Sequence, residues 1–187
     1  MAEFNSKEYW EARYQGGGNS GIGSYGVSAN IKAEYINSVI SKYNIKTIND
    51  LGHGDGNQIG LLKGFDQYTG YDVSSTIRNK CILQYQDDRR YTFIDNESQF
   101  KQADLAMSLD VLYHLTEQEV FVEYIDKLFS IGEYILIYAE DRDFKGNSHV
   151  LCRKFTNYIS DVYNNFSLLD IADGSHKEVK LFLYKKQ

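Results

Sequence analysis

The stretch TINDLGHGDG, residues 47–56, constrains the fold more than any other part of the chain. Its first half, Thr47 to Leu51, is a short apolar-rich run that predicts a buried strand. Glycines at alternate positions follow and predict a tight turn, and residues 57–63 predict a short helix that ends at Gly64. A strand, a glycine turn and a helix in this order are typical of the ligand-binding turn of an open α/β sheet.

Strands and helices continue to alternate through the rest of the chain. A second strand is predicted to end at Asp72, with Ser74 or Ser75 as the cap of the next helix. Further strand-like runs are RYTFID, ADLAMSLD and EYILIYAED, and Thr116 to Glu119 forms a capping box that predicts another helix start. The final runs, FSLLDI and VKLFLYKK, predict an antiparallel hairpin. We therefore predict an α/β fold with a mostly parallel sheet, helices on both faces and an antiparallel edge.

A second glycine-rich stretch, GGGNSGIGSYG at residues 16–26, contains the G-x-G-x-x-G spacing of dinucleotide-binding turns. It lies between two predicted helices, one in residues 2–15 and one in residues 28–43. A dinucleotide-binding turn follows a strand, so that the pyrophosphate meets the N-terminus of the next helix. After the strand at residues 47–51 the spacing is G-x-G-x-G, with Asn57 at the third position. The sequence therefore argues against NAD as the ligand of either glycine-rich stretch.

Length and composition indicate a single domain. The 187 residues suffice for one domain with a real core, and we expect N-terminal helices and a glycine-rich segment in residues 1–45 before an α/β core in residues 46–187. No apolar run approaches the ~20 residues that cross a bilayer, and no secretory signal is visible. We therefore expect a cytoplasmic protein without a membrane partner. A formal net charge of −6 argues against a nucleic-acid partner.

Acidic side chains follow the predicted strands at the edge of the sheet where a ligand is expected. They are Asp50, Asp72, Asp95, Asp110, Glu140 and Asp141. Such a rim repels a pyrophosphate but favours a cationic ligand that carries hydroxyl groups. S-adenosylmethionine fits this description, since it has a sulfonium and a ribose diol but no phosphate. Gly52 and Gly54 would let the turn approach this ligand closely, and Asp72 could accept both ribose hydroxyls.

These motifs resemble a known family. The runs DLGHGDGNQ and SLDVLYHL, together with Asp72 and the C-terminal hairpin, resemble the class I S-adenosylmethionine-dependent methyltransferases. The runs YWEARYQGGGNSGIGSYG and SHVLCRKFTNYI narrow the resemblance to a compact subgroup of bacteria and large DNA viruses, whose members lie beside or are fused to glycosyltransferases. The resemblance covers nearly the whole chain and implies a Rossmann-like fold, S-adenosyl-L-methionine as cofactor and an association with glycosyltransferases. One departure is His53, where the subgroup usually has cysteine.

The resemblance also implies roles for individual residues. Asp72 would hold the ribose, Asp95 would face the adenine amino group, and Leu109 and Asp110 would line the methionine portion. The first helix and residues 16–26 would form a lid over the cofactor, with backbone N–H groups reaching its carboxylate; a flexible linker is the alternative for this segment. The predicted cofactor-binding residues are Tyr14, Ser20, Gly21, Asp50, Gly52, His53, Gly54, Asp72, Val73, Asp95, Leu109 and Asp110.

The absence of proline limits which classes of molecule can be the methyl acceptor. Enzymes that methylate the amino groups of bases or glutamine use an N/D-P-P-Y/F motif after the fourth strand, where this chain has Asp110 to Tyr113. This difference argues against a DNA methyltransferase and favours a hydroxyl group on a small molecule or a sugar. An alcohol must lose a proton during methylation, and His114 and His149 are the candidate bases. Tyr113 and Arg153 could shape a sugar pocket.

The sequence is compatible with several functions. The leading hypothesis is O-methylation of a sugar or glycan hydroxyl. The alternatives are a methyltransferase of another small molecule, a non-catalytic module that binds S-adenosylmethionine, and, last, an NAD-dependent dehydrogenase. No metal site is predicted, because Asp110, Asp141 and Asp143 do not have a ligand spacing that supports one strongly.

Overall fold

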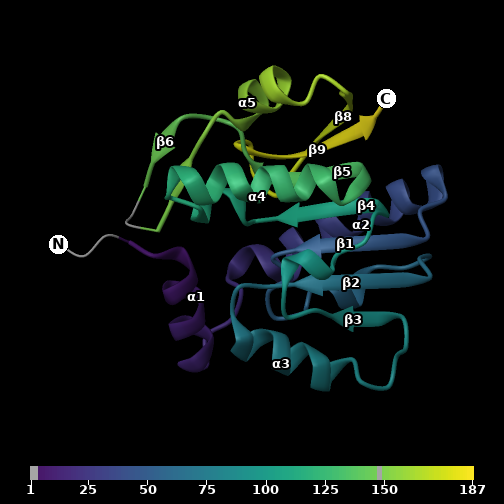
Figure 1. Ribbon diagram of the computed structural model, residues 1–187, viewed down its shortest axis with the longest axis vertical. Coiled ribbons are helices and arrows are strands. Elements are labelled where there is room, and N and C mark those ends of the chain that lie inside the picture. Colours follow the sequence, from purple (N-terminus) through teal and green to yellow (C-terminus); the bar gives the residue numbers. More distant parts are fainter. Residues whose placement is uncertain (1–3, 147–148) are drawn as a thin grey trace.

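A computed structural model describes residues 4–146 and 149–187 of the chain. Seven strands form one sheet in the order β3-β2-β1-β4-β5-β9-β8 (Figure 1). Strands β1 to β5 pair in parallel, β9 pairs antiparallel with β5, and β8 pairs antiparallel with β9. The strands are β1 (Thr47–Leu51), β2 (Gln67–Tyr71), β3 (Tyr91–Phe93), β4 (Ala103–Leu109), β5 (Gly132–Glu140), β8 (Phe166–Asp173) and β9 (Val179–Lys186). The predicted fold class and the C-terminal hairpin are confirmed.

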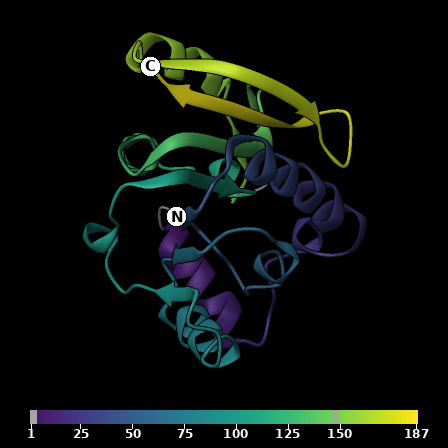
Figure 2. The same cartoon turned by 90° about the vertical axis from the view of Figure 1, so that its right-hand side faces the viewer.

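Helices cover both faces of the sheet. One buried cluster joins α2 to the sheet through side chains such as Ile36 and Leu105, and the other joins α4 and α5 through Ile125 and Ile159. Figure 2 shows α2 and α4 on opposite sides of the sheet. The helices are α1 (Ser6–Gln15), α2 (Gly26–Tyr43), α3 (Ser75–Gln84), α4 (Gln118–Ser130) and α5 (Phe155–Val162). No helix in the described ranges is both long and apolar enough to cross a membrane.

Residues 57–63 do not form the predicted helix. The only regular structure there is a 3₁₀ turn, Ile59–Leu61. The side-chain amides of Asn57 and Gln58 donate to the carbonyls of Ser24 and Ala29, at 2.6 and 3.1 Å. Left-handed glycines at positions 56 and 64 also interrupt the backbone on both sides of the segment. Contacts with the start of α2 therefore replace a regular helix.

The predicted capping box at the start of α4 is also wrong. The helix begins at Gln118, and the side chain of its N-cap residue Glu117 makes no capping hydrogen bond. The Glu117 carboxylate instead accepts hydrogen bonds from the N–H and the hydroxyl of Ser6, at 2.9 and 3.3 Å. Glu117 therefore attaches the first turn of α1 to the core. A short hairpin of β6 (Phe144–Lys145) and β7 (Leu151–Cys152), which the sequence did not predict, follows β5.

Candidate functional site

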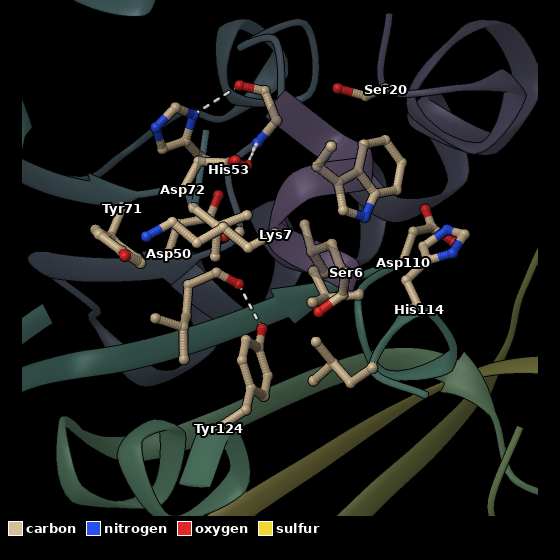
Figure 3. A pocket seen from close by; sticks show the side chains of 18 of the residues that line it. Ser6, Lys7, Ser20, Asp50, His53, Tyr71, Asp72, Asp110, His114 and Tyr124 are labelled. Carbon is tan, nitrogen blue, oxygen red and sulfur yellow. Dashed lines mark hydrogen bonds between the residues drawn. The ribbon is translucent and has the colours of Figure 1, made fainter. Parts of the chain in front are cut away.

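A cavity of about 460 Å³ lies beyond the carboxyl ends of β1, β2 and β4. Its lining comes from the glycine turn after β1, from the residues that follow β2 and β4, and from α4. Side chains of α1 and of the segment between α1 and α2 also line it (Figure 3). The volume lies within the range of small-molecule sites. The cavity is where an open α/β sheet is expected to bind its ligand.

Two positions of the turn require glycine, both because of their backbone conformation and because of the close packing around them. Gly52 and Gly54 have φ values of 94° and 61°, which L side chains rarely adopt. A Cβ atom on Gly52 would lie 2.6 Å from Cγ2 of Val111, and one on Gly54 would lie 2.3 Å from Oγ of Ser20. The turn is therefore in direct contact with the residues after β4 and with the segment between α1 and α2.

Asp72 follows β2 directly and faces the glycine turn. One carboxylate oxygen accepts from the Gly54 N–H at 3.0 Å, and the other accepts from the Ser74 N–H at 3.0 Å. Ser74 in turn caps α3 by accepting from the N–H of Ile77, as predicted. An ionised carboxylate has about four acceptor sites, so Asp72, which also lines the cavity, retains capacity for two further donors.

Asp50 and His53 are buried polar groups in the cavity wall. Asp50 accepts from the hydroxyl of Tyr68 at 2.7 Å, while its other oxygen, Oδ1, has no partner among the described residues. Burial raises the pKa of Asp50 to about 7. His53 Nδ1 lies 2.7 Å from the Gly54 carbonyl, which can only accept, so Nδ1 carries the proton. Burial lowers the pKa of His53 and keeps the ring neutral.

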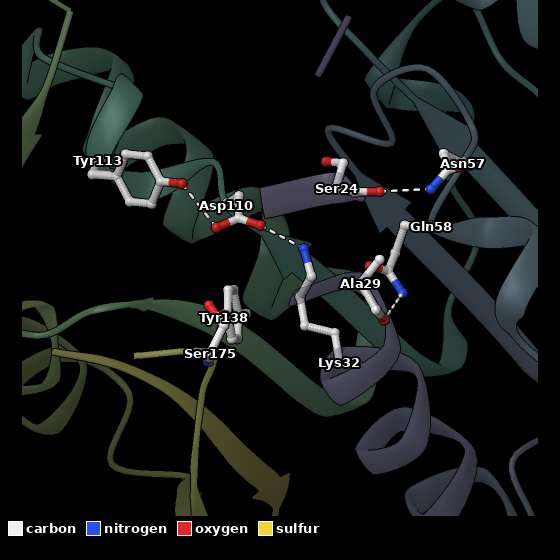
Figure 4. Close-up of polar contacts among 9 residues, drawn as sticks. All are labelled: Ser24, Ala29, Lys32, Asn57, Gln58, Asp110, Tyr113, Tyr138 and Ser175. Carbon is white, nitrogen blue, oxygen red and sulfur yellow. Dashed lines mark hydrogen bonds and ion pairs between the residues drawn. The ribbon is translucent and has the colours of Figure 1, made fainter. Parts of the chain in front are cut away.

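Asp110, after β4, adopts a left-handed conformation with a φ of 62°. One carboxylate oxygen pairs with Lys32 Nζ at 2.5 Å, and the other accepts from the hydroxyl of Tyr113 at 2.8 Å (Figure 4). Lys32 comes from α2 and is only 1% exposed. Lys32 was not predicted as a site residue, because a lysine on an amphipathic helix ordinarily lies in solvent.

The segment between α1 and α2 is attached to the glycine turn by reciprocal hydrogen bonds. Asp55 accepts from the Ser20 N–H at 2.8 Å and from the hydroxyl of Tyr25 at 2.7 Å. The Asp55 N–H donates to Ser20 Oγ at 2.8 Å, and the Tyr14 hydroxyl lies 3.0 Å from the same atom. Residues 16–26 therefore rest on the cavity instead of extending away from it.

His114 lies in a short 3₁₀ turn after β4 and lines the cavity. Its Nδ1 atom is 2.9 Å from the carbonyl of His149, so this nitrogen is the protonated one and Nε2 is the acceptor. Burial lowers the pKa of His114. The Trp10 ring packs edge-on against His114 at 4.9 Å between centroids. The ring of His149 stacks between those of His114 and Tyr9 and does not line the cavity.

The cavity brings most of the predicted site residues together. Those that line it are Tyr14, Ser20, Asp50, Gly52, His53, Gly54, Asp72, Val73, Leu109, Asp110 and His114. The lining does not include Gly21, Asp95, Tyr113, His149 or Arg153. The Arg153 guanidinium donates to the carbonyls of Leu115 and Thr116, which attaches β7 to the start of α4. Lining residues that the sequence analysis did not single out include Trp10, Lys32, Gln58 and Tyr124.

Metal ligands are not gathered anywhere in the part of the chain that the structure describes, since no group of three or more His, Cys, Asp or Glu residues could hold an ion there. Asp141 accepts from the N–H and the hydroxyl of Thr156, and Asp143 accepts from the Lys154 N–H. These two carboxylates therefore organise the start of α5.

No protein-family model matches the chain, and no curated protein matches it. Solved structures match it along most or nearly all of its length. N-methyltransferase NodS from Bradyrhizobium japonicum WM9 has a TM-score of 0.73 and 12% identity, with 98% of this chain and 99% of that chain covered. Magnesium protoporphyrin IX methyltransferase ChlM from Synechocystis PCC 6803 has a TM-score of 0.72 and 16% identity, with 97% and 98% covered. The methyltransferase domain of bacterial CtHen1-C has a TM-score of 0.67 and 20% identity, with 84% and 98% covered.

The chain has the fold of a class I methyltransferase. The seven-stranded sheet with its antiparallel edge is shared with these structures, so the Rossmann-like fold expected from the resemblance is confirmed. At these identities the likeness concerns the methyltransferase fold, and the subgroup associated with glycosyltransferases stays a prediction.

Proposed function

We propose that this protein is an S-adenosylmethionine-dependent methyltransferase whose acceptor is a hydroxyl group of a sugar or glycan. The charge of the cavity carries the proposal. Among its lining residues are six carboxylates, namely Asp50, Asp72, Glu97, Asp110, Glu117 and Glu123, and two lysines, Lys7 and Lys32. Such a lining attracts a sulfonium and repels the pyrophosphate of NAD.

The residues present fit S-adenosylmethionine. Asp72 has acceptor capacity left for a ribose diol, and the glycines at 52 and 54 place bare backbone in the cavity wall, in close contact with Val111 and Ser20. NodS and ChlM, which share the fold, were both solved with bound S-adenosylhomocysteine. When bound, S-adenosylmethionine supplies an electrophilic methyl group on sulfur. Positioning of the acceptor oxygen in line with that group is then the main task of the protein.

His114 is the general base in this proposal. Its Nδ1–H donates to the His149 carbonyl, which leaves Nε2 as a proton acceptor, and its lowered pKa keeps the ring neutral near pH 7. S-adenosylmethionine would supply the methyl group to the acceptor oxygen, and the electron pair of its broken carbon–sulfur bond would stay on sulfur. The hydroxyl proton goes to Nε2 of His114. His149 positions His114 through its backbone carbonyl and its stacked ring.

A sugar acceptor is favoured by the aromatic wall beside His114. Trp10 lines the cavity and lies against the His114 ring, and aromatic surfaces of this kind suit the apolar faces of a sugar ring. We also propose that a glycosyltransferase provides the glycan, on the strength of the subgroup resemblance. Another solved neighbour is a small RNA methyltransferase, HEN1, so RNA is the acceptor class that must be tested against sugars. The acidic lining disfavours a polyanion.

The test is methyl transfer from isotope-labelled S-adenosylmethionine to a panel of sugars, glycans, small amines and a small RNA. We expect transfer to a sugar or glycan and a loss of about 10²-fold or more in turnover in His114→Gln. S-adenosylhomocysteine binding should be retained in that variant. His176→Gln is the matched control, because His176 is exposed in the β8–β9 turn. Transfer to RNA or an amine alone would contradict the sugar assignment, and binding without transfer to any acceptor would indicate a non-catalytic module.

A further inference from the structure

The α2 side of the cavity contains a buried cation and buried acceptors that the protein itself does not satisfy. We infer that this side binds the α-amino-acid group of the ligand as a zwitterion, with Lys32 on its carboxylate and with Gln58 and Asp50 on its ammonium. The inference rests on the proposed function, since S-adenosylmethionine carries this group at the end opposite its adenine.

Lys32 provides donors for the carboxylate. Its ammonium group has three N–H donors, and one of them is engaged by Asp110. The Tyr138 ring lies beneath the ammonium at 4.9 Å, and no second hydrogen-bond acceptor is recorded for Lys32 among the described residues. Burial of a cation with unused donors is costly. Because Lys32 lines the cavity, an anionic group of the ligand can meet those donors.

Gln58 and Asp50 provide acceptors for the ammonium. Gln58 Oε1 and Asp50 Oδ1 are both buried without a hydrogen-bond partner among the described residues, and both residues line the cavity that Lys32 lines. The Gln58 amide nitrogen donates to the carbonyl of Ala29, which lies three residues before Lys32 on α2. The Gln58 side chain is therefore held against α2 about one turn before Lys32, as Figure 4 shows.

The backbone amides that the sequence analysis assigned to this task are already engaged. The Ser20 N–H donates to Asp55 and the Gly21 N–H donates to the side chain of Asn19, at 2.8 and 3.0 Å. They could reach a ligand carboxylate only by breaking these bonds. Lys32 needs no such rearrangement. A carboxylate beside Lys32 and an ammonium beside Gln58 and Asp50 would satisfy all three groups at once.

The test compares variants across three ligands by calorimetry. S-adenosylhomocysteine carries the whole amino-acid group, its decarboxylated analogue keeps only the amine, and 5′-methylthioadenosine has neither group. We expect Lys32→Met to lower the affinity for S-adenosylhomocysteine about ten- to a hundredfold. The affinity for the other two ligands should change by less than about threefold. Gln58→Met should weaken both amine-bearing ligands and spare 5′-methylthioadenosine. Lys63→Met, at an exposed lysine, is the matched control.

The outcomes separate this inference from the proposed function. Equal weakening of S-adenosylhomocysteine and 5′-methylthioadenosine by Lys32→Met, or no weakening of either, would overturn the zwitterion site and leave the cofactor proposal standing. If Lys32→Met does not fold because Asp110 is left unpaired, Lys32→Met combined with Asp110→Asn removes both charges and takes its place. The wild-type protein provides an independent measure: it should bind S-adenosylhomocysteine at least tenfold more tightly than 5′-methylthioadenosine. Equal affinities would overturn the inference, and binding of neither ligand would overturn the proposed function with it.

Discussion

Asp72 shows how a single carboxylate can serve both the backbone and a ligand. It accepts from the Gly54 and Ser74 N–H groups and still lines the cavity. Asp72→Ala would therefore loosen the glycine turn as well as remove a ligand contact, so Asp72→Asn is the better variant. We expect this variant to weaken the binding free energy of S-adenosylhomocysteine by about 1.5–3 kcal/mol, as for the loss of a hydrogen bond to a charged group. Calorimetry measures this effect.

A control at a neighbouring aspartate makes this prediction specific. Asp66 is exposed just before β2, and Asp66→Asn should leave the affinity for S-adenosylhomocysteine unchanged. Thermal unfolding should show that Asp72→Asn remains folded. A folded Asp72→Asn protein with wild-type affinity would mean that the ribose lies elsewhere.

Asp50 should release a proton when the cofactor binds. In the free protein, burial raises its pKa to about 7, nearby Asp72 adds to the rise, and Tyr68 and Lys32 oppose it. A ligand ammonium beside Oδ1 would favour the ionised form and lower this pKa. Near pH 7 the free carboxyl is partly protonated, so binding must release protons. Calorimetry of S-adenosylhomocysteine binding in buffers of different ionisation enthalpy measures the release, which should disappear in Asp50→Asn. Proton uptake in the wild type at pH 7 would contradict the assignment.

At the scale of elements, α1 and residues 16–26, which we propose as a lid, are held to the core mainly by carboxylates. Glu117 holds the start of α1, Glu11 accepts from the hydroxyls of Ser75 and Thr76 at the start of α3, and Asp55 holds Ser20 and Tyr25. Contacts of this kind, with little apolar burial, allow local opening at low cost. The structure therefore supports a lid more than a linker.

Asp55→Asn should open this lid without unfolding the core. Ser20 and Tyr25 both donate to Oδ2 of Asp55, and Asn57 donates its N–H to Oδ1. An amide oxygen in place of Oδ2 is uncharged and therefore a weaker acceptor for Ser20 and Tyr25, and the amide NH₂ group would face the Asn57 N–H. We expect faster hydrogen exchange at residues 16–25 in the variant, and slower exchange there when S-adenosylhomocysteine is added to the wild type. Asp66→Asn again serves as control. Exchange at residues 16–25 that responds to neither the ligand nor the variant would restore the linker interpretation.

At the scale of the whole molecule, the core does not depend on the lid. The two buried clusters that join the sheet to its helices contain no described residue before Ala33. Deletion of residues 1–25 leaves α2 whole, since this helix begins at Gly26. We expect a cooperatively unfolding core that binds S-adenosylhomocysteine more weakly and transfers little methyl, because water can enter the open cavity. Circular dichroism melting and calorimetry test this prediction, and full activity of the truncated chain would exclude a lid.

Local patterns in the sequence were sufficient for much of the fold. Strand β1 spans the predicted Thr47–Leu51, and Ser74 caps α3 as expected. The glycine turn with Asp72 beyond it also lies at the predicted edge of the sheet. These features depend on backbone conformation and on apolar periodicity over a few residues, and both are visible in a short stretch of sequence.

Only the tertiary structure decided which polar groups meet. Lys32 pairs with Asp110 across 78 positions of sequence, and Ser6 binds Glu117 across 111. For this reason a lysine of an amphipathic helix became a buried cavity residue, and the glutamate of an apparent capping box became an attachment point for α1. Arg153, which was predicted to shape a sugar pocket, instead donates hydrogen bonds to the carbonyls of Leu115 and Thr116. The sequence alone determined the glycine turn and most of the order of strands and helices, because these follow from local backbone preferences; the helix expected at residues 57–63 and the unpredicted β6–β7 hairpin are the exceptions. The charges and acceptors of the cavity depend on long-range contacts between side chains, which no local pattern encodes.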